Sequence, residues 1–302
     1  MKITAKDVAK LLTPRPKDCH KGSFGYVALI GGSIEYSGAI RLAAMANAAM
    51  RSGAGVATIA APRSICPVIA GSILEPTLFP LSDADGELVF KEEEFSKICE
   101  RYDTIAFGMG IGLSDEVVKA VDYLLENYNN TLIVDADGLN AMSKLNIERI
   151  KNSEASLVLT PHFKEFSRLS GLSIDEIKED PETAITALAD KLDAIVLLKG
   201  STTYVSEPET YAESLGFESR RIFTSDSGCA GMATAGSGDV LSGILSAICV
   251  NADDLTQRTV AGAFINGKAG ELAQDMSSDI SMTASDTAAC IAKAISEIRI
   301  AK

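Results

Sequence analysis

The sequence contains no tryptophan and only two histidines, His20 and His162, among its 302 residues. Zinc enzymes that rely on several histidine ligands are therefore not expected. The six cysteines are scattered along the chain without a close pair, so the spacing of a zinc finger or of a small disulfide framework is absent. Reduced thiols are the simplest interpretation, and they predict a cytoplasmic location.

Long apolar segments and basic residues are also scarce. No uninterrupted apolar run is long enough to span a bilayer, and the first residues include no apolar signal region, so no membrane partner is expected. The 28 basic residues against 41 acidic ones give a net charge of −13, which repels nucleic acid at long range. This charge still allows a locally positive pocket for a phosphorylated ligand.

Familiar catalytic signatures are missing as well. The chain has neither a Walker-type G-x-x-x-x-G-K-S/T loop nor the nucleophile elbow of a Ser/His/Asp hydrolase. The run Gly108-x-Gly110-x-Gly112 lacks the G-x-G-x-x-G spacing of a dinucleotide fingerprint, which weakens the case for an NAD-dependent dehydrogenase. A tight turn and a close approach of the backbone to a ligand both remain open for it.

What the chain does contain is an alternation of short apolar runs and helical patterns. Strands are predicted over residues 26–30, 55–60, 104–107, 131–134, 157–159, 194–198 and 202–205. Helices are predicted over residues 39–51, 114–128, 181–192, 255–276 and 284–299. Short all-apolar strands separated by helices are typical of a parallel sheet buried on both faces. With no linker or internal repeat, the sequence predicts one α/β domain that spans residues 1–302.

The stretch Gly236-Ser237-Gly238-Asp239 precedes an apolar helical pattern, so a helix should begin near Asp239. A glycine turn at a helix start leaves backbone N–H groups unpaired, and with the helix dipole these form an anion site. A carboxylate there repels a phosphate unless it removes a proton from an attacking hydroxyl or lies beside a cation. Asp239 is therefore either a catalytic base or a residue that only complements the dipole.

Several polar residues follow predicted strands, and the carboxyl ends of parallel strands are where ligands bind. Asp135 and Asp137 either bind Mg²⁺ through water or orient a helix start. His162 either contacts a ligand or is solvated, and Glu165 either favours a helix dipole or holds Mg²⁺ through water. Lys199 either contacts a phosphate, together with the residues that follow it, or extends its ammonium to water.

Taken together, these motifs resemble the NAD(P)H-hydrate dehydratase family of the ribokinase-like superfamily. The matching pieces occur in the family's order and are His20–Gly22, Gly31–Ser33, Tyr36–Ala39, Gly108–Gly112, Val134–Asn140, Leu159–His162 with Glu165 and Phe166, Leu198–Gly200, and Met232–Leu241. The resemblance implies a three-layer α/β/α fold with a mostly parallel central sheet. It also implies an ADP-dependent (6S)-NAD(P)H-hydrate dehydratase that repairs hydrated NADH or NADPH, with ATP as the donor in other members.

The resemblance also implies roles for individual residues. Asp239 would deprotonate the ring hydroxyl of the hydrate, phosphate from ADP would be transferred to it, and loss of that phosphate would restore the nicotinamide. The residues expected to face the hydrate are Ala39, Gly110, His162 and Asp239. The residues expected to hold the adenine nucleotide are Lys199, Gly200, Ser201, Thr202, Thr203, Gly236, Ser237 and Gly238. Mg²⁺ is expected to screen the phosphates, with Glu165 as its water-mediated contact.

Two positions depart from the family pattern. Asn266 stands where the family often has a histidine, and Ser225–Cys229 replaces the usual asparagine-containing approach to the glycine turn. The second departure bears on the nucleotide pocket and therefore on the choice of donor. The family's epimerase partner is expected to be a separate chain, and the resemblance implies a homo-oligomer, a tetramer in many members.

Three alternatives remain. A small-molecule kinase of the same superfamily, acting on a vitamin precursor or a sugar alcohol, would use the same turn and aspartate but stop at the phosphate ester. The Thr160-Pro161-His162 and His20-Lys21-Gly22 pieces count against it. A nucleotide sensor without chemistry would gain nothing from Asp239, and the dehydrogenase lacks its fingerprint spacing.

Overall fold

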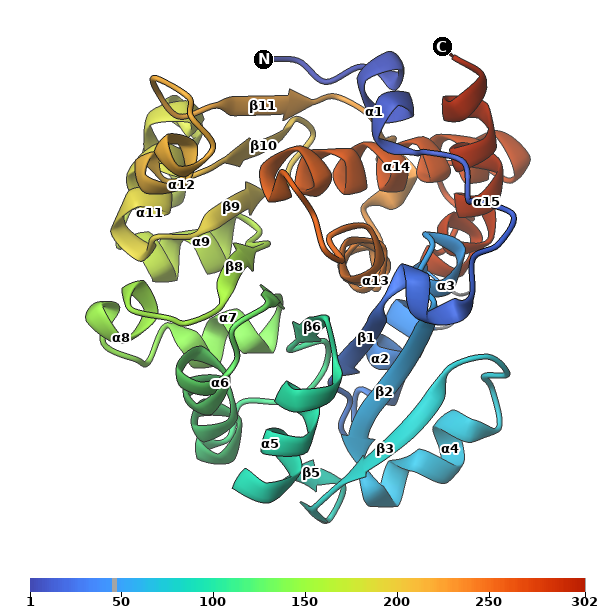
Figure 1. Ribbon diagram of the computed structural model, residues 1–302, viewed down its shortest axis with the longest axis vertical. Coiled ribbons are helices and arrows are strands. Elements are labelled where there is room, and N and C mark those ends of the chain that lie inside the picture. The colour runs from blue at the N-terminus through green and yellow to red at the C-terminus, as the bar shows by residue number, and fades with distance from the viewer. Residues whose placement is uncertain (45–47, 302) are drawn as a thin grey trace.

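The computed structural model describes residues 1–44 and 48–301, in which nine strands form one sheet of order β11-β10-β9-β8-β7-β6-β1-β2-β3 (Figure 1). Its strands are β1 (Tyr26–Ile30), β2 (Val56–Pro62), β3 (Thr77–Leu81), β6 (Thr104–Phe107), β7 (Thr131–Val134), β8 (Ser156–Leu159), β9 (Ile195–Leu198), β10 (Thr203–Ser206) and β11 (Ile222–Ser225). A separate two-stranded hairpin joins β4 (Asp83–Ala84) and β5 (Glu87–Leu88). In the main sheet β10 pairs antiparallel with both neighbours and the other pairings are parallel, so the predicted mostly parallel sheet is confirmed.

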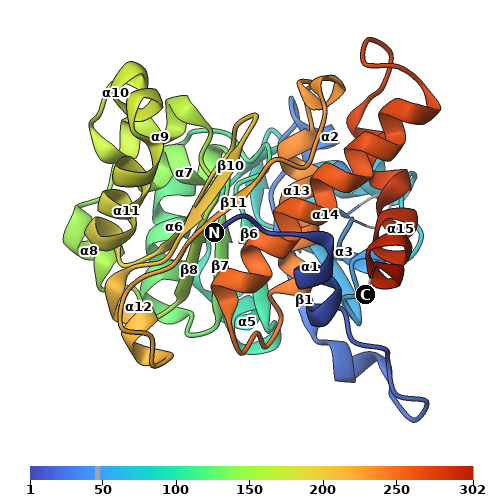
Figure 2. The ribbon, with the colours of Figure 1, turned by 90° about the horizontal axis from the view of Figure 1, so that it is seen from above.

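Helices cover both faces of this sheet, as Figure 2 shows from above. One face packs against α1 (Ala5–Leu11), α2 (Ser37–Ala44), α3 (Ala48–Arg51), α13 (Ser237–Ile248), α14 (Leu255–Met276) and α15 (Ala284–Ile300). The other packs against α5 (Glu92–Arg101), α6 (Asp115–Asn127), α7 (Asp137–Met142), α8 (Ile147–Lys151), α9 (Phe163–Ser170), α10 (Ile174–Glu179) and α11 (Pro181–Leu192). The shorter α4 (Cys66–Ala70) and α12 (Glu209–Ser214) lie near the two ends of the sheet (Figure 1).

The central strands are buried because their side chains point into two separate apolar cores. Along β1, Val27 and Leu29 belong to the core beneath α13 and α14, whereas Ala28 and Ile30 belong to the opposite core. Alternate residues of a strand point to opposite faces, so a sheet covered on both sides needs apolar residues at every position. This explains why continuous apolar runs marked these strands in the sequence.

The structure contains elements that were not predicted, both among the helices, such as α5 and α10, and at the sheet edges. The edge strands β3 and β11 were not predicted. The sequence of β3 includes Pro80, which signals against a strand, and β11 follows the polar pair Arg220 and Arg221. The helix predicted near Asp239 begins two residues earlier, at Ser237, and part of the helix predicted over residues 39–51 lies outside the described residues.

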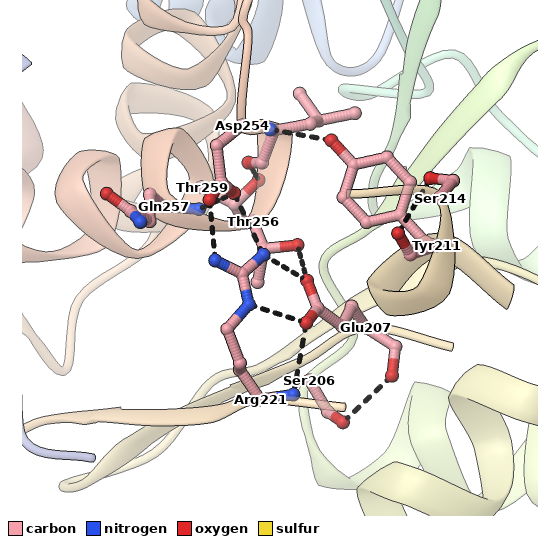
Figure 3. Close-up of polar contacts among 10 residues, drawn as sticks. Ser206, Glu207, Tyr211, Ser214, Arg221, Asp254, Thr256, Gln257 and Thr259 are labelled. Atoms are coloured by element: carbon pink, nitrogen blue, oxygen red, sulfur yellow. Dashed lines mark hydrogen bonds and ion pairs between the residues drawn. The ribbon is translucent and has the colours of Figure 1, made fainter. Parts of the chain in front are cut away.

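A buried ionic network ties the β10–β11 hairpin to the start of α14 (Figure 3). Glu207 is fully buried and accepts hydrogen bonds from Arg221 Nε at 2.7 Å and from Thr256 Oγ1 at 2.6 Å. Arg221 also pairs with Asp254 at 2.5 Å, and Asp254 accepts a hydrogen bond from the backbone of Gln257 as the N-cap of α14. The orientation of α14 relative to the sheet is therefore set partly by paired charges.

No helix among the described residues combines the length and the apolar character that a membrane crossing requires.

Candidate functional site

The loops that follow the parallel strands meet at one edge of the sheet. The backbone N–H of Gly32, after β1, donates to Met109 O at 2.8 Å, after β6. The backbone N–H of Lys199, after β9, donates to Pro161 O at 3.0 Å, after β8. The sequence-predicted polar residues at these strand ends are thus neighbours in space.

An anion site lies at this edge, at the start of α13. Gly236 is the N-cap residue and has φ 93°, in the left-handed region that favours glycine. Within the described residues, the backbone N–H groups of Gly238 and Asp239 have no hydrogen-bond acceptor. A Cβ placed on Gly238 would lie 3.4 Å from Lys199 Nζ, so the ammonium lies beside the first turn of α13. A positive side chain and a helix N-terminus converge on one point, which suits a phosphate.

Lys199 is held in place by an ion pair with Asp135, at 2.6 Å from Nζ to Oδ1. The other carboxylate oxygen of Asp135 accepts a hydrogen bond from Ser242 Oγ of α13 at 2.8 Å. Burial opposes the charge of Lys199, but the carboxylates of Asp135 and Glu165 outweigh burial and raise its pKa. The lysine therefore stays protonated, and one carboxylate links the ends of β7 and β9 to α13.

Asp239 lies in the first turn of α13 and differs from an ordinary surface carboxylate. Burial, reinforced by the negative charge of Asp135, raises its pKa from the ordinary 3.8 to about 7, although Lys199 opposes the shift. Its carboxylate has no hydrogen-bond donor among the described side chains and N–H groups. A carboxylate that titrates near neutrality and is not committed to a structural contact is suited to remove a proton.

A cavity of about 590 Å³ opens beside the anion site. It is lined by residues of the β9–β10 turn, the loop before η4 (Ala230–Met232), α13 and α14. Six of the eight residues predicted to hold the nucleotide line it: Lys199, Gly200, Ser201, Thr203, Ser237 and Gly238. The other two do not line it: Thr202 Oγ1 donates to Asp226 at 2.8 Å, and a Cβ on Gly236 would meet Leu42.

The residues predicted to face the hydrate lie outside this cavity, at the same sheet edge. Gly110 adjoins Ala39 so closely that a Cβ on the glycine would lie 2.8 Å from the alanine Cβ. His162 pairs with Lys199 through an isolated β-bridge. The structure thus brings Ala39 to Gly110 and His162 to Lys199, and it places Asp239 close enough to Lys199 for the two charges to interact.

Glu165 has a clear structural role. It forms a capping box with His162: the His162 N–H donates to Glu165 Oε2 at 2.8 Å, and the Glu165 N–H donates to His162 Nδ1 at 3.2 Å. Burial raises the pKa of Glu165, which Lys199 partly offsets. Across the described part of the chain, no cluster of three or more acidic, histidine or cysteine side chains is arranged to hold a metal by itself. The metal role of Glu165 stays a prediction.

The sequence identified only part of the far wall of the cavity, through the departure at Ser225–Cys229. This wall comprises Ser227–Ala230 and Met232 of the loop, and Ala263, Asn266 and Gly267 of α14. The loop is fastened to α14 because Glu271 accepts from the Gly228 N–H at 3.0 Å and Gln274 from the Gly231 N–H at 3.1 Å. The sequence signal for the α14 part of this wall is the pair Asn266-Gly267 in the middle of a mostly apolar helix. From the sequence alone, Asn266 is recognised only as a departure from the family pattern.

The fold and the site define a ribokinase-like α/β protein, with a helix N-terminus and a lysine at the carboxyl edge of a mostly parallel sheet. A family model for NAD(P)H-hydrate dehydratase matches residues 27–293. The chain belongs to the NAD(P)H-hydrate dehydratase family.

Individual relatives agree with this assignment. The ADP-dependent (S)-NAD(P)H-hydrate dehydratase of Neisseria meningitidis is 32% identical over 281 residues, which cover 90% of this chain and 85% of that protein. The bifunctional NAD(P)H-hydrate repair enzyme of Thermofilum pendens is 34% identical over 277 residues, which cover 91% of this chain and 50% of that protein. The chain spans about half the length of such bifunctional relatives.

A solved structure shows the same fold over the whole chain. The ADP/ATP-dependent NAD(P)H-hydrate dehydratase of Bacillus subtilis, crystallised with ATP and Mg²⁺, has a TM-score of 0.80 to this chain at 25% identity. The match covers 98% of this chain and 97% of that one. The expected ribokinase-like fold is thereby confirmed.

Proposed function

We propose that this protein is an ADP-dependent NAD(P)H-hydrate dehydratase, which restores NADH or NADPH from its hydrated form. The observation that carries the proposal is the convergence of Lys199 and the start of α13 beside Asp239, whose pKa is raised to about 7. Family membership favours this reaction over the alternative of a small-molecule kinase.

The proposed reaction has two steps. Asp239 takes the proton from the ring hydroxyl of the hydrate, the hydroxyl oxygen bonds to the β-phosphorus of ADP, and the bond from that phosphorus to AMP breaks. The carbon–oxygen bond of the phosphate ester then breaks with both electrons leaving on phosphate, and loss of a ring proton forms the carbon–carbon double bond. Lys199 and the N–H groups of Gly238 and Asp239 would stabilise the charge on the transferring phosphate. Ala39, Gly110 and His162 would orient the hydrate.

Magnesium fits the chemistry of this site. Mg²⁺ bound with a nucleotide needs only one or two protein carboxylates, because phosphates and waters supply its other ligands. The carboxylates of Glu165 and Asp239 lie close enough to Lys199 to interact with its charge, and Asp137 interacts with Asp239. Glu165 is the proposed water-mediated contact. The ion would neutralise phosphate charge.

The remaining proposals concern the setting of the enzyme. We propose ADP rather than ATP as the donor, as in the relative from Neisseria meningitidis. A cytoplasmic location agrees with the six cysteines, which are all free thiols. A homotetramer and an epimerase as a partner activity remain expectations from the family resemblance.

The direct test incubates the purified protein with NADH hydrate, Mg²⁺ and either ADP or ATP, and follows the return of the reduced nicotinamide absorbance. Recovery with ADP and little recovery with ATP is the expected result. Recovery with ATP alone would overturn the proposed donor and keep the reaction. Absence of recovery from folded protein that binds ADP would favour the kinase, to be followed by a screen of hydroxylated vitamin precursors.

A further inference from the structure

The carboxamide oxygen of Asn266 is a buried acceptor without a partner in the described part of the chain. The residue is 7% exposed, in the middle of α14, and its Oδ1 has no hydrogen-bond donor among the described residues. Leaving a buried acceptor unpaired costs stability, and asparagine is a poor helix former, so packing alone does not favour this residue here. A partner that arrives with a ligand would account for it.

Asn266 lines the same cavity as Lys199 and Gly238, which belong to the anion site. The lining also includes apolar side chains, among them Ala263, Met232 and Leu241. The lining of this cavity therefore combines a cation suited to phosphates with apolar side chains and one carboxamide.

The wall around Asn266 is built before any ligand arrives. Gly267, the next residue, touches the loop so closely that a Cβ on it would lie 2.4 Å from Ser227 Oγ. Glu271 and Gln274, further along the same helix, accept hydrogen bonds from the backbone of that loop. A carboxamide carried by a rigid helix against a fastened loop is preorganised to orient a flat ligand.

We propose that Asn266 recognises the nucleobase and selects adenine over 6-oxopurines. The inference rests on the proposed function, because it assumes that the cavity holds the donor nucleotide. The edge of adenine that carries N6 and N7 presents an amine donor beside a ring-nitrogen acceptor. The oxygen and the NH₂ group of a single carboxamide can pair with both. A 6-oxopurine presents two acceptors on that edge, so the carboxamide oxygen would face an acceptor and one pairing would be lost. Asn266 Oδ1 accepts no hydrogen bond within the described residues, so this oxygen is available to the base.

The test measures the binding of ADP and of IDP by calorimetry in the presence of Mg²⁺, without any hydrate. The wild-type protein is expected to bind ADP about tenfold more tightly than IDP. Asn266→Leu, which keeps the size of the side chain and removes its polar atoms, is expected to weaken ADP binding and bring the two affinities within about twofold of each other. Asn266→Ala is the second variant. The control is Gln257→Leu, which replaces an amide on the same helix outside the cavity and should keep the wild-type ratio of ADP to IDP affinity.

A purely structural role predicts a different outcome. If Asn266 only supported the fold, Asn266→Leu would lower the melting temperature and leave the ADP-to-IDP ratio unchanged. We expect the melting temperature without nucleotide to stay level or rise, because the variant removes an unpaired buried group. Equal wild-type affinities for ADP and IDP, or an unchanged ratio in both Asn266 variants, would overturn the inference alone if ADP still supports repair of the hydrate. Failure of the wild-type protein to bind either nucleotide would overturn the proposed function as well.

Discussion

The ammonium of Lys199 lies 2.6 Å from a carboxylate oxygen of Asp135, across the strand that separates them in the sheet. The same aspartate raises the pKa of Asp239 by charge repulsion, after the larger effect of burial. One buried carboxylate therefore holds the proposed phosphate-binding cation and also adjusts the proposed base.

The first prediction concerns the dependence of turnover on pH. Asp239 acts as a base only when ionised, so kcat/KM should rise through a pKa of about 7. Asp135→Asn removes a negative charge that disfavours the ionisation of Asp239, so the rise of kcat/KM should move to lower pH. Steady-state rates with ADP and hydrate across the pH range check both statements. If the rise of kcat/KM in Asp135→Asn occurred at the same pH as in the wild type, it would contradict the proposed charge interaction between Asp135 and Asp239.

The second prediction concerns Asp239→Asn. Turnover should fall by about 10²–10⁴-fold, the usual contribution of a general base, while the Kd for ADP stays within a few-fold of wild type. Single-turnover rates and calorimetry separate the two effects. Loss of binding with turnover reduced in proportion would assign Asp239 to nucleotide binding instead.

The same variant carries a stability test whose sign follows from the raised pKa. Between the ordinary value of 3.8 and about 7, the folded protein retains a proton that the unfolded chain releases. Stability is therefore lost as pH rises through this window, by up to a few kcal/mol, on the order that such a shift implies. Asp239→Asn removes this loss of stability. Its midpoint of unfolding should therefore lie at a higher denaturant concentration than that of the wild type at about pH 8, and the two midpoints should differ less at about pH 4. Equal midpoints at both pH values would argue against a raised pKa.

The third prediction compares two glycines of the same turn. Gly238 has no left-handed backbone angle, and a Cβ there meets Lys199 Nζ and Asp135 only at 3.4 and 3.5 Å. Gly238→Ala should therefore fold normally, with stability unchanged or raised by up to about 0.5–1 kcal/mol, while its methyl group obstructs a phosphate and raises the KM for ADP.

Gly236→Ala is the matched control for that experiment. Gly236 has φ 93°, and a Cβ there would lie 2.4 Å from Leu42 Cδ1, so this variant should lose stability. Melting temperatures and KM values for ADP measure both changes. A Gly238→Ala variant with normal KM would show that phosphate does not approach the start of α13.

The parts of this molecule that were predictable from sequence are those that local pattern determines. Central strands such as β7 and β9 were found because burial on both faces makes every position apolar. The edge strands β3 and β11 carry no such signal, because an edge position tolerates proline and polar neighbours.

The site was predictable where a motif implies a backbone conformation, as in the glycine turn before Asp239. Its side-chain pairings were not, because they join distant segments: Asp135 and Lys199 are 64 residues apart. Asn266 shows the same limit, since a polar residue in a helix pattern gives no sign of whether it faces solvent or a cavity. Its burial is a property of the assembled fold.

The fourth prediction concerns the pairing of Lys199 with Asp135. Lys199→Met removes the phosphate contact and leaves a buried carboxylate without its cation, so both ADP affinity and stability should fall, the latter by about 3 kcal/mol. The double variant Lys199→Met/Asp135→Asn removes the orphaned charge and should recover much of the stability. It should recover none of the ADP affinity. Denaturant unfolding and calorimetry on the four proteins complete the cycle, and additive stability losses would show that the two residues act independently.

The last prediction concerns the ionic network at the start of α14 (Figure 3). Glu207→Gln leaves the buried guanidinium of Arg221 with Asp254 as its remaining charged partner, so the free energy of unfolding should fall by about 3 kcal/mol. Glu93→Gln, in an exposed pair with Lys97, should cause no measurable loss.

Measurements of ADP binding distinguish the structural role of this network from the role of the nucleotide site. Asp254 precedes Asn266 by 12 residues, or about 18 Å of helix, so the Kd for ADP should change less than about threefold in Glu207→Gln below its melting transition. Lys199→Met, with a similar loss of stability, should weaken ADP binding far more. If both variants weakened binding equally, the position of α14 relative to the sheet would control the nucleotide site, and the network would have to be counted among its positioning residues.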